Sequence, residues 1–361
     1  MKRLEALLSK KIMVLDGAMG TMLQAYNFDE QDFRGTQFKN HHIPLVGNND
    51  LLSITQPDAI YEVHAKYLEA GADIIETNTF SGTTIAMSDY ALEDYVTELN
   101  VASAQIARKA ADDYTAKNPS KPRFVAGSIG PTNKTASMSP DVSDPGYRAI
   151  TFDELKVAYR QQASGLIEGG VDVLLVETVF DTLNAKAALF AIDELKEELG
   201  SDIPVMVSGT ITDASGRTLS GQTVEAFLVS IAHIDLLSVG FNCALGADQL
   251  KPYVQRLGQQ AQCFVSAHPN AGLPNAFGEY DQTPQQMCDL IESYMIDGLV
   301  NIIGGCCGST PAHIQLLAQA ASNYTPRKIS QNVWSKVFIA FWIGTLGRAS
   351  KHQFCQYWRT H

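Results

Sequence analysis

The sequence predicts an α/β protein with the (β/α)8 TIM barrel fold, as a single domain with an atypical C-terminal tail. Short apolar runs alternate with segments that carry apolar residues at helical spacing, as in proteins with a parallel sheet. Eight such runs occur, which is the number that a closed barrel needs. The glycine fingerprint of the competing open sheet is missing. These three observations together favour the barrel.

The candidate strands are rich in Val, Ile and Leu, and most of them end at a small or polar residue. Continuous apolar runs are typical of strands that are buried on both faces. The strands are expected at residues 12–16, 73–77, 124–129, 171–178, 204–209, 236–242, 264–268 and 299–303. Apolar residues at helical spacing predict helices over residues 59–68, 102–111, 152–167, 182–199, 223–231 and 283–296.

An open, doubly wound sheet is the alternative, because it shares the alternation and the apolar strands. Its G-x-G-x-x-G fingerprint does not follow the first strand, where the sequence at residues 16–20 is D-G-A-M-G. No Walker-type lysine loop occurs in the sequence either. Both absences disfavour the open sheet.

Composition and charge exclude several classes of protein. The chain has 361 residues and is 45% hydrophobic, which is enough for a full core and excludes a collagen-like or disordered protein. Its 27 basic and 39 acidic residues give a net charge of −12, which repels nucleic-acid phosphates, so no nucleic-acid partner is expected. Charged residues such as Glu5 and Lys10 interrupt the N-terminal apolar stretches, so we expect no secretory signal and a cytoplasmic protein.

The composition changes at about residue 325, so we expect a barrel domain at residues 4–325 and a tail at residues 326–361. The tail has six basic residues, no acidic residue and all three tryptophans of the chain. Its apolar run at residues 337–346 is too short to span a membrane, and no membrane partner is expected. One interpretation is a helix that covers a barrel end. The other is a linker remnant or out-of-frame sequence. We favour it because residues 4–325 already supply the eight strand–helix units of a complete barrel.

In barrels of this kind, the active site is built at the carboxyl ends of the strands. Cysteines stand at two of these ends: Cys243 after the sixth strand, and the adjacent Cys306 and Cys307 in a glycine-rich turn after the eighth. Neighbouring cysteines rarely form a disulfide, but glycines can let both sulfurs face one point. Three thiolates from two strands leave one tetrahedral position open, which is typical of catalytic zinc. The sequence therefore predicts a metal site at Cys243, Cys306 and Cys307.

The other cysteines, Cys263, Cys288 and Cys355, are interpreted as small buried apolar residues. His268 also ends a strand, but it is left out of the metal site because a packed histidine is the commoner case. An alternative of another class is a barrel enzyme that binds a phosphorylated substrate at residues 304–310, although this leaves the paired cysteines without a role.

Two carboxylates, Asp16 and Glu177, follow the first and fourth strands. At the same barrel mouth as a metal, they suit the ammonium group of a substrate, although loop amides could equally satisfy them. The sequence S-T-P at residues 309–311 has the order of a helix start. Its amide end could hold a substrate carboxylate, or it could simply cap the helix.

Three motifs, D-G-A-M-G-T (16–21), G-F-N-C (240–243) and G-G-C-C-G-S-T-P (304–311), resemble those of the homocysteine S-methyltransferase family. Four further runs look most similar to the N-terminal homocysteine-binding module of cobalamin-dependent methionine synthase: N-D-L-L (49–52), E-T-N-T-F (76–80), G-S-I-G-P-T (127–132) and P-N-A-G-L-P-N (269–275). The resemblance covers about residues 4–325.

The resemblance implies zinc-dependent transfer of a methyl group to the thiol of L-homocysteine, giving L-methionine. Cys243, Cys306 and Cys307 would bind Zn2+, and the substrate sulfur would take the open position. Asp16 and Glu177 would hold the substrate ammonium. The remaining contacts implied for substrate binding are main-chain groups near Ala18 and Ser128, and the side chain of Thr79.

The resemblance further implies methylcobalamin as the immediate methyl donor and 5-methyltetrahydrofolate as the ultimate one. The modules that bind them lie outside this sequence, so the cobalamin-binding module is an expected partner, and the tail suggests a truncated or frame-shifted product. Two alternatives remain open. One is a standalone enzyme that uses S-methylmethionine or betaine, and the other is a domain that binds zinc and homocysteine without physiological turnover.

Overall fold

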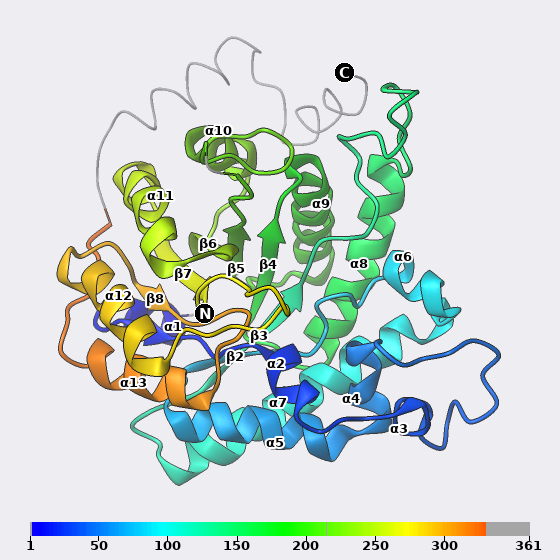
Figure 1. The fold of residues 1–361 in the computed structure, drawn as a ribbon, viewed down its shortest axis with the longest axis horizontal. Helices are drawn as coiled ribbons and strands as arrows, with labels where there is room; N and C mark the ends of the chain where they lie inside the picture. The colour runs from blue at the N-terminus through cyan, green and yellow to red at the C-terminus, as the bar shows by residue number, and fades with distance from the viewer. Residues whose placement is uncertain (1, 214, 330–361) are drawn as a thin grey trace.

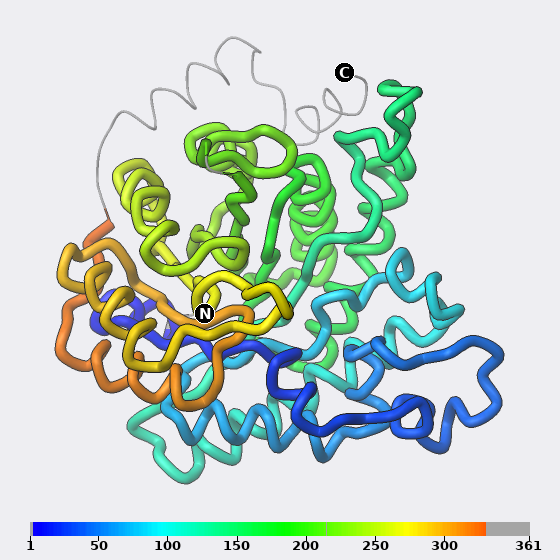
Figure 2. Tube along the Cα trace, viewed as in Figure 1, coloured from blue at the N-terminus to red at the C-terminus, as the bar shows by residue number. Residues whose placement is uncertain are grey.

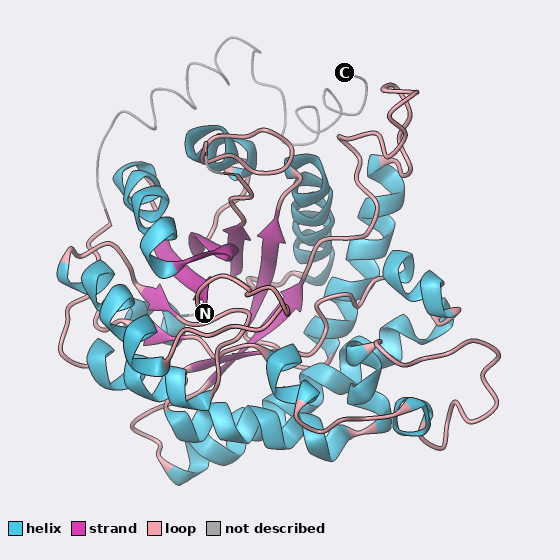
Figure 3. Ribbon diagram, viewed as in Figure 1, coloured by secondary structure: helices cyan, strands magenta, loops and turns pink. Residues whose placement is uncertain are grey.

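The computed structural model describes residues 2–213 and 215–329, in which eight parallel strands form a barrel within a ring of helices (Figures 1 and 3). The (β/α)8 prediction is confirmed, and each expected apolar run coincides with one strand. The strands are β1 (Met13–Val14), β2 (Ile74–Glu76), β3 (Phe124–Ile129), β4 (Val173–Val179), β5 (Val205–Gly209), β6 (Ser238–Gly246), β7 (Phe264–Asn270) and β8 (Ile302–Ile303).

Strands that follow one another along the chain lie side by side, and β1 pairs with β8. A parallel bridge between Leu15 and Ile74 joins β1 to β2 and completes the ring. The amide of Asp16 also donates a 3.0 Å hydrogen bond to the carbonyl of Ile74. The carboxyl ends of all eight strands therefore surround one mouth, as the site prediction requires.

Eight helices cover the outside of the barrel. The structure adds two helices to the six expected ranges, and one of the two contains Pro252, which normally disfavours a helix interior. The last helix packs against the first outer helix and β1, so the two ends of the described barrel meet (Figure 2). The helices are α5 (Pro57–Ala70), α7 (Val96–Lys117), α8 (Phe152–Glu168), α9 (Thr182–Leu199), α10 (Val224–Ile231), α11 (Ala247–Gln260), α12 (Pro284–Ile296) and α13 (Pro311–Ala321).

The barrel interior changes from apolar to polar along the strands. Side chains alternate between the two faces of a strand, so every second residue points inward. On β4, Val173 and Leu175 belong to the apolar cluster inside the barrel, and Glu177 is the next residue of the same set. Helix α1 (Lys2–Leu8) closes the apolar end with Leu4 and Leu8. The polar end of the interior is therefore the mouth.

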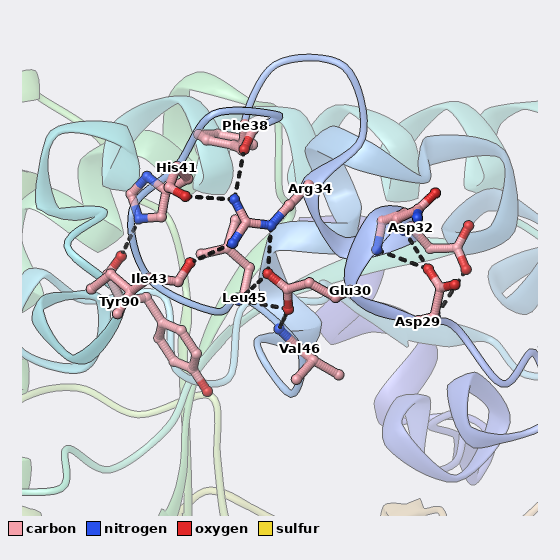
Figure 4. A network of polar contacts seen from close by, with 11 residues as sticks. Asp29, Glu30, Asp32, Arg34, Phe38, His41, Ile43, Leu45, Val46 and Tyr90 are labelled. Atoms are coloured by element: carbon pink, nitrogen blue, oxygen red, sulfur yellow. Dashed lines mark hydrogen bonds and ion pairs between the residues drawn. The ribbon is translucent and has the colours of Figure 1, made fainter.

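The connection between β1 and α5 is long and carries its own polar network (Figure 4). Arg34 donates hydrogen bonds to the carbonyls of His41 and Ile43, at 2.6 and 3.0 Å, and pairs with Glu30 at 2.6 Å. Glu30 also accepts a 2.9 Å hydrogen bond from the amide of Leu45. These bonds fix the loop that follows α3. The short helices of this connection are α2 (Met19–Gln24), α3 (Glu30–Arg34), η1 (Asn49–Leu51) and α4 (Leu52–Thr55).

Three further short helices lie between β2 and α7, namely α6 (Thr84–Met87), η2 (Ser88–Tyr90) and η3 (Glu93–Tyr95). After α13 the chain remains attached to the barrel as far as Arg327. Its guanidinium donates to the carbonyls of Gly258 and Ala261, at 2.6 and 2.8 Å. The rest of the predicted tail, with the three tryptophans and Cys355, lies outside the described residues. Within residues 2–213 and 215–329, no helix is long and apolar enough to cross a membrane.

Candidate metal and substrate site

A bulge at the end of β6 places Cys243 at the barrel mouth. The register between β6 and β7 shifts between Asn242 and Gly246. Within this shift, Cys243 and Ala244 have φ angles of 58° and 54°, in the left-handed region that residues other than glycine rarely adopt. Bulges beside active sites commonly redirect a side chain in this way, and strained backbone concentrates at functional sites.

A second bulge, at the end of β4, places Glu177. The register between β4 and β5 shifts between Val176 and Val179. Thr178 lies inside the shift with a φ angle of 54°. Glu177 and Cys243, which the sequence singled out separately, are therefore both presented by irregular strand ends.

The structure brings together the three cysteines that the sequence selected. The Sγ atoms of Cys243, Cys306 and Cys307 all lie within 4.8 Å of one another, and all three residues are half-buried. The sulfurs of Cys243 and Cys307 are 3.7 Å apart. Tetrahedral zinc with Zn–S bonds of about 2.3 Å separates its sulfur ligands by about 3.8 Å. The donor set and this spacing fit a zinc ion bound by three thiolates.

Cys243 and Cys306 form a disulfide in this structure, with their Cα atoms 5.7 Å apart. This pairing was not predicted from the sequence, in which only a disulfide between the neighbouring Cys306 and Cys307 was disfavoured. Cys307 is a free thiol beside the disulfide. Because a metal binds cysteine as the thiolate, the disulfide is the oxidised alternative to metal binding, and the metal site needs the reduced protein.

Main-chain hydrogen bonds hold the turn that carries the cysteine pair. The amide of Cys306 donates to the carbonyl of Pro269 at 2.9 Å, and that of Cys307 donates to Oδ1 of Asn270 at 3.1 Å. Gly308, which follows them, has a φ angle of 78°, and a Cβ there would lie 2.3 Å from Cβ of Tyr280. The turn therefore requires glycine at residue 308.

Three carboxyl groups, that of Asp16 just after β1 and those of Glu76 on β2 and Glu177 on β4, lie close enough to influence one another. Burial raises the pKa of Asp16 well above its usual range, and the neighbouring Glu177 raises it further. Burial, Glu177 and Asp16 raise the pKa of Glu76 in the same way. Burial also raises the pKa of Glu177 to about 7. Oδ2 of Asp16 accepts a 3.1 Å hydrogen bond from the amide of Glu76, whereas its buried Oδ1 has no partner. A cluster of buried carboxyl groups with an unpartnered oxygen is suited to bind a cation.

The remaining residues predicted to contact substrate lie near these carboxyl groups or on the turns around them. Ser128 is buried, and its hydroxyl donates to Oε1 of Glu177 at 2.5 Å. Thr79 is completely buried, and its hydroxyl donates to the carbonyl of Ser128 at 2.7 Å. The amide of Ala18 donates to Oγ of Ser309 at 3.2 Å, and this hydroxyl donates to the carbonyl of Cys306 at 2.6 Å. The Ala18 turn is thus tied to the cysteine turn.

His268 is buried on β7, and its Nε2 has no partner. Burial lowers its pKa to about 4, so the imidazole is neutral at pH 7. The group of residues that could hold a metal within the described part of the chain consists of the three cysteines and does not include His268.

Two further carboxyl groups, Glu76 and Asp50, occur in runs that carry the resemblance but were not predicted as site residues. Asp50 is buried and accepts a 2.6 Å hydrogen bond from the amide of Ser81. Burial, with a smaller effect from Glu177, raises its pKa to about 7. The position of Glu76, as the last residue of β2, was the available signal. Asp50 lies in the N-D-L-L run at residues 49–52, but nothing in the run marks it as a site residue, because it comes from the long connection after β1 and not from a strand end.

Comparison with solved structures shows the same fold in a known enzyme. The metallated form of the homocysteine methyltransferase MmuM from Escherichia coli matches with a TM-score of 0.68 and 24% identity, covering 88% of this chain and 99% of that chain. The oxidized form of the same enzyme matches with a TM-score of 0.66 and 23% identity, covering 85% of this chain and 95% of that chain.

The family model described as homocysteine S-methyltransferase matches residues 13–321, which extends from the start of β1 to the end of α13. The match includes the three cysteines and the three carboxyl groups described above. The protein is therefore a methyltransferase, and the chain belongs to the homocysteine S-methyltransferase family.

Proposed function

We propose that the protein transfers a methyl group to the thiol of L-homocysteine in a zinc-dependent reaction that gives L-methionine. The observation that carries this proposal is the convergence of three cysteine sulfurs at the barrel mouth that also presents the buried carboxyl groups. A substrate for this mouth needs both a soft donor atom and a cation. Homocysteine has both, in its thiol and its ammonium group.

Cys243, Cys306 and Cys307 would hold the zinc ion through their thiolates. When bound, zinc lowers the pKa of a coordinated thiol and so supplies a thiolate nucleophile at neutral pH, where a free thiol is mostly protonated. The cysteine turn fixes two ligands through its main-chain bonds to Pro269 and Asn270. The bulge in β6 fixes the third.

Asp16 and Glu177 would bind the substrate ammonium, and Glu76 lies within their electrostatic influence. Ser128 donates to Glu177 and would orient its carboxylate. The main chain near Ala18 and Ser128 and the side chain of Thr79 would line the substrate pocket. Holding the amino-acid end of the substrate fixes the direction of its sulfur. This orientation supplies part of the rate enhancement.

We propose methylcobalamin, carried by a cobalamin-binding module outside this chain, as the immediate methyl donor. The ultimate donor would be 5-methyltetrahydrofolate, and the reaction would take place in the cytoplasm. Support comes from sequence runs such as residues 76–80 and 269–275, which resemble the homocysteine module of cobalamin-dependent methionine synthase. S-methylmethionine and betaine are the alternative donors.

The test is methyl transfer to L-homocysteine by the reduced, zinc-loaded chain, with free methylcobalamin, S-methylmethionine and betaine as separate donors. We expect turnover with methylcobalamin that is lost on zinc removal and restored with zinc. Cys306→Ala should lose zinc and activity, whereas Cys288→Ala, a buried cysteine outside the three-sulfur group, should keep both. Zinc and homocysteine binding without turnover would indicate a binding domain, and turnover only with another donor would exclude the cobalamin proposal.

A further inference from the structure

Asn242 is a completely buried amide that touches both halves of the site, although the proposed function gives it no role. Its Nδ2 donates to the hydroxyl of Thr178 at 2.8 Å and to Sγ of Cys306 at 3.8 Å. In this structure the Cys306 sulfur is part of the disulfide with Cys243. Its Oδ1 accepts from the amide of Thr178 at 3.1 Å and from the hydroxyl of Ser208 at 2.7 Å. One side chain thus joins the β4 bulge, β5 and a metal-binding cysteine.

The hydrogen-bonding capacity of this amide is completely used. A carboxamide has two N–H donors and two acceptor positions on its oxygen, and all four have partners here. An aspartate in the same place keeps both acceptor positions but cannot donate to the sulfur. Burial of the site makes a lost partner costly. The pattern of partners therefore specifies asparagine.

In the reduced protein, where Cys306 is a thiolate, this contact with sulfur would give Asn242 a chemical effect as well as a structural one. An N–H donor draws electron density from a thiolate and fixes its direction, and such outer contacts tune bound metals. The two bonds to Thr178 place the same amide against the bulge that presents Glu177. The side chain of Asn242 therefore links the bulge that carries the Glu177 carboxylate to the sulfur of Cys306, so that a movement of one is transmitted to the other.

We propose that Asn242 is a positioning residue that couples the ammonium-binding bulge at residues 177–178 to the metal centre, by holding and polarising the thiolate of Cys306. The inference rests on the proposed function, because it assumes that Cys306 binds a metal. Asn242 itself touches neither metal nor substrate. Its influence passes through Cys306 on one side and Thr178 on the other.

The experiment uses the reduced full chain loaded with Co2+, whose sulfur-to-metal charge-transfer band reports on the thiolates without any turnover. Asn242→Asp keeps both acceptor contacts and removes both donor contacts, to the sulfur and to the hydroxyl of Thr178. Asn242→Ala removes all four contacts. The matched control is Asn301→Asp. Asn301 is also completely buried, and it bonds the amide of Val265 and the carbonyl of Arg327, away from the sulfurs.

We expect both Asn242 variants to weaken Co2+ binding about 10- to 100-fold. Their charge-transfer band should move to longer wavelength, since a sulfur without its N–H donor is more electron-rich. Asn301→Asp should lower the melting temperature but leave the band where it is. If neither folded Asn242 variant shifts the band or the Co2+ affinity, the proposal is wrong. If one variant fails to fold, the other decides. If both fail, the wild-type band is measured with added L-homoserine, which has the ammonium group but no thiol to bind the metal. A band that does not move then refutes the coupling.

A failure of the proposed function gives a different experimental result from a failure of this inference. A wild-type chain that shows no charge-transfer band with Co2+ has no metal centre of three thiolates, which overturns the proposed function and this inference together. A wild-type band that the Asn242 variants leave unchanged overturns the inference alone.

Discussion

The hydroxyl of Ser128 on β3 donates a 2.5 Å hydrogen bond to Oε1 of Glu177 in the β4 bulge. Both residues are buried at the polar end of the barrel interior. Burial raises the pKa of Glu177, whereas hydrogen bonds from Ser128 and Thr178 lower it, and the balance is a pKa of about 7. The charge of this carboxyl group near neutral pH therefore depends on its neighbours.

Ser128→Ala should weaken homocysteine binding. Without the hydroxyl donor, the pKa of Glu177 rises further and the carboxylate loses its orientation. A hydrogen bond to a charged group contributes about 1.5–3 kcal/mol, so KM for homocysteine should rise about 10- to 100-fold while zinc content stays the same. The measurement is steady-state kinetics at pH 7. Ser103→Ala, which removes a buried hydroxyl without a partner on α7, should leave KM unchanged.

The buried carboxyl groups should make the substrate-free protein less stable as the pH rises. The pKa values of Asp50 and Glu177 are about 7 in the folded state, above their ordinary values of 3.8 and 4.5. At pH values between the ordinary pKa and the pKa in the folded state, these groups bind more protons in the folded state than in the unfolded state. The free energy of unfolding therefore falls as the pH rises toward and through 7. One such group contributes at most about 1.4 kcal/mol per pH unit.

Melting temperatures of the substrate-free protein from pH 5 to pH 8 measure this effect. The wild type should melt at a lower temperature at pH 8, and Glu177→Gln should show a smaller decrease. Glu168→Gln, at the exposed end of α8, should follow the wild type. A melting temperature that rises over this range would contradict the assigned pKa directions.

Binding of L-methionine should show the opposite pH dependence, because it needs ionised carboxylates to pair with its ammonium group. Affinity should increase as the pH rises from 5 to 8, and protons should be released on binding near pH 7. Methionine is the better ligand here than homocysteine because it has no thiol to titrate. Calorimetry in buffers of different ionisation enthalpy measures the released protons. Affinity that is independent of pH would exclude a role for the raised pKa values.

The strands could be predicted from the sequence because a parallel barrel buries both faces of each strand, which leaves continuous apolar runs. Helix α11 was missed because Pro252 lies within it and argues against a helix. The closure of the ring is a tertiary property, since it depends on the bridge between Leu15 and Ile74 rather than on any local pattern.

The candidate site was predictable where residue type and position at a strand end coincide, as for Cys243 and the cysteine pair. The two bulges could not be predicted, because they arise from register shifts against the neighbouring strands. The contacts of Asn242 were missed for the same reason. Its partners Thr178 and Cys306 lie 64 residues away on either side, and only the closed barrel brings them together.

Gly308→Ala should disrupt the cysteine turn. Both Gly308 and Gly200 have φ angles in the left-handed region, 78° and 59°, where an alanine costs about 1–2 kcal/mol. A Cβ at Gly308 would also collide with Tyr280, whereas one at Gly200 meets nothing within 4 Å. Gly308→Ala should therefore lose more stability and also lose metal. Melting curves with zinc analysis test this, and equal losses in Gly200→Ala would contradict it.

Zinc X-ray absorption spectroscopy of the reduced, zinc-loaded chain, with and without L-homocysteine, tests most directly whether the three cysteines bind zinc and the substrate sulfur joins them. We expect three sulfur ligands at about 2.3 Å without substrate, and four sulfur ligands when homocysteine is bound. L-homoserine, which has a hydroxyl in place of the thiol, should leave the number of sulfur ligands at three. Fewer than three sulfurs in the substrate-free chain, or a number that homocysteine does not change, would contradict the central claim.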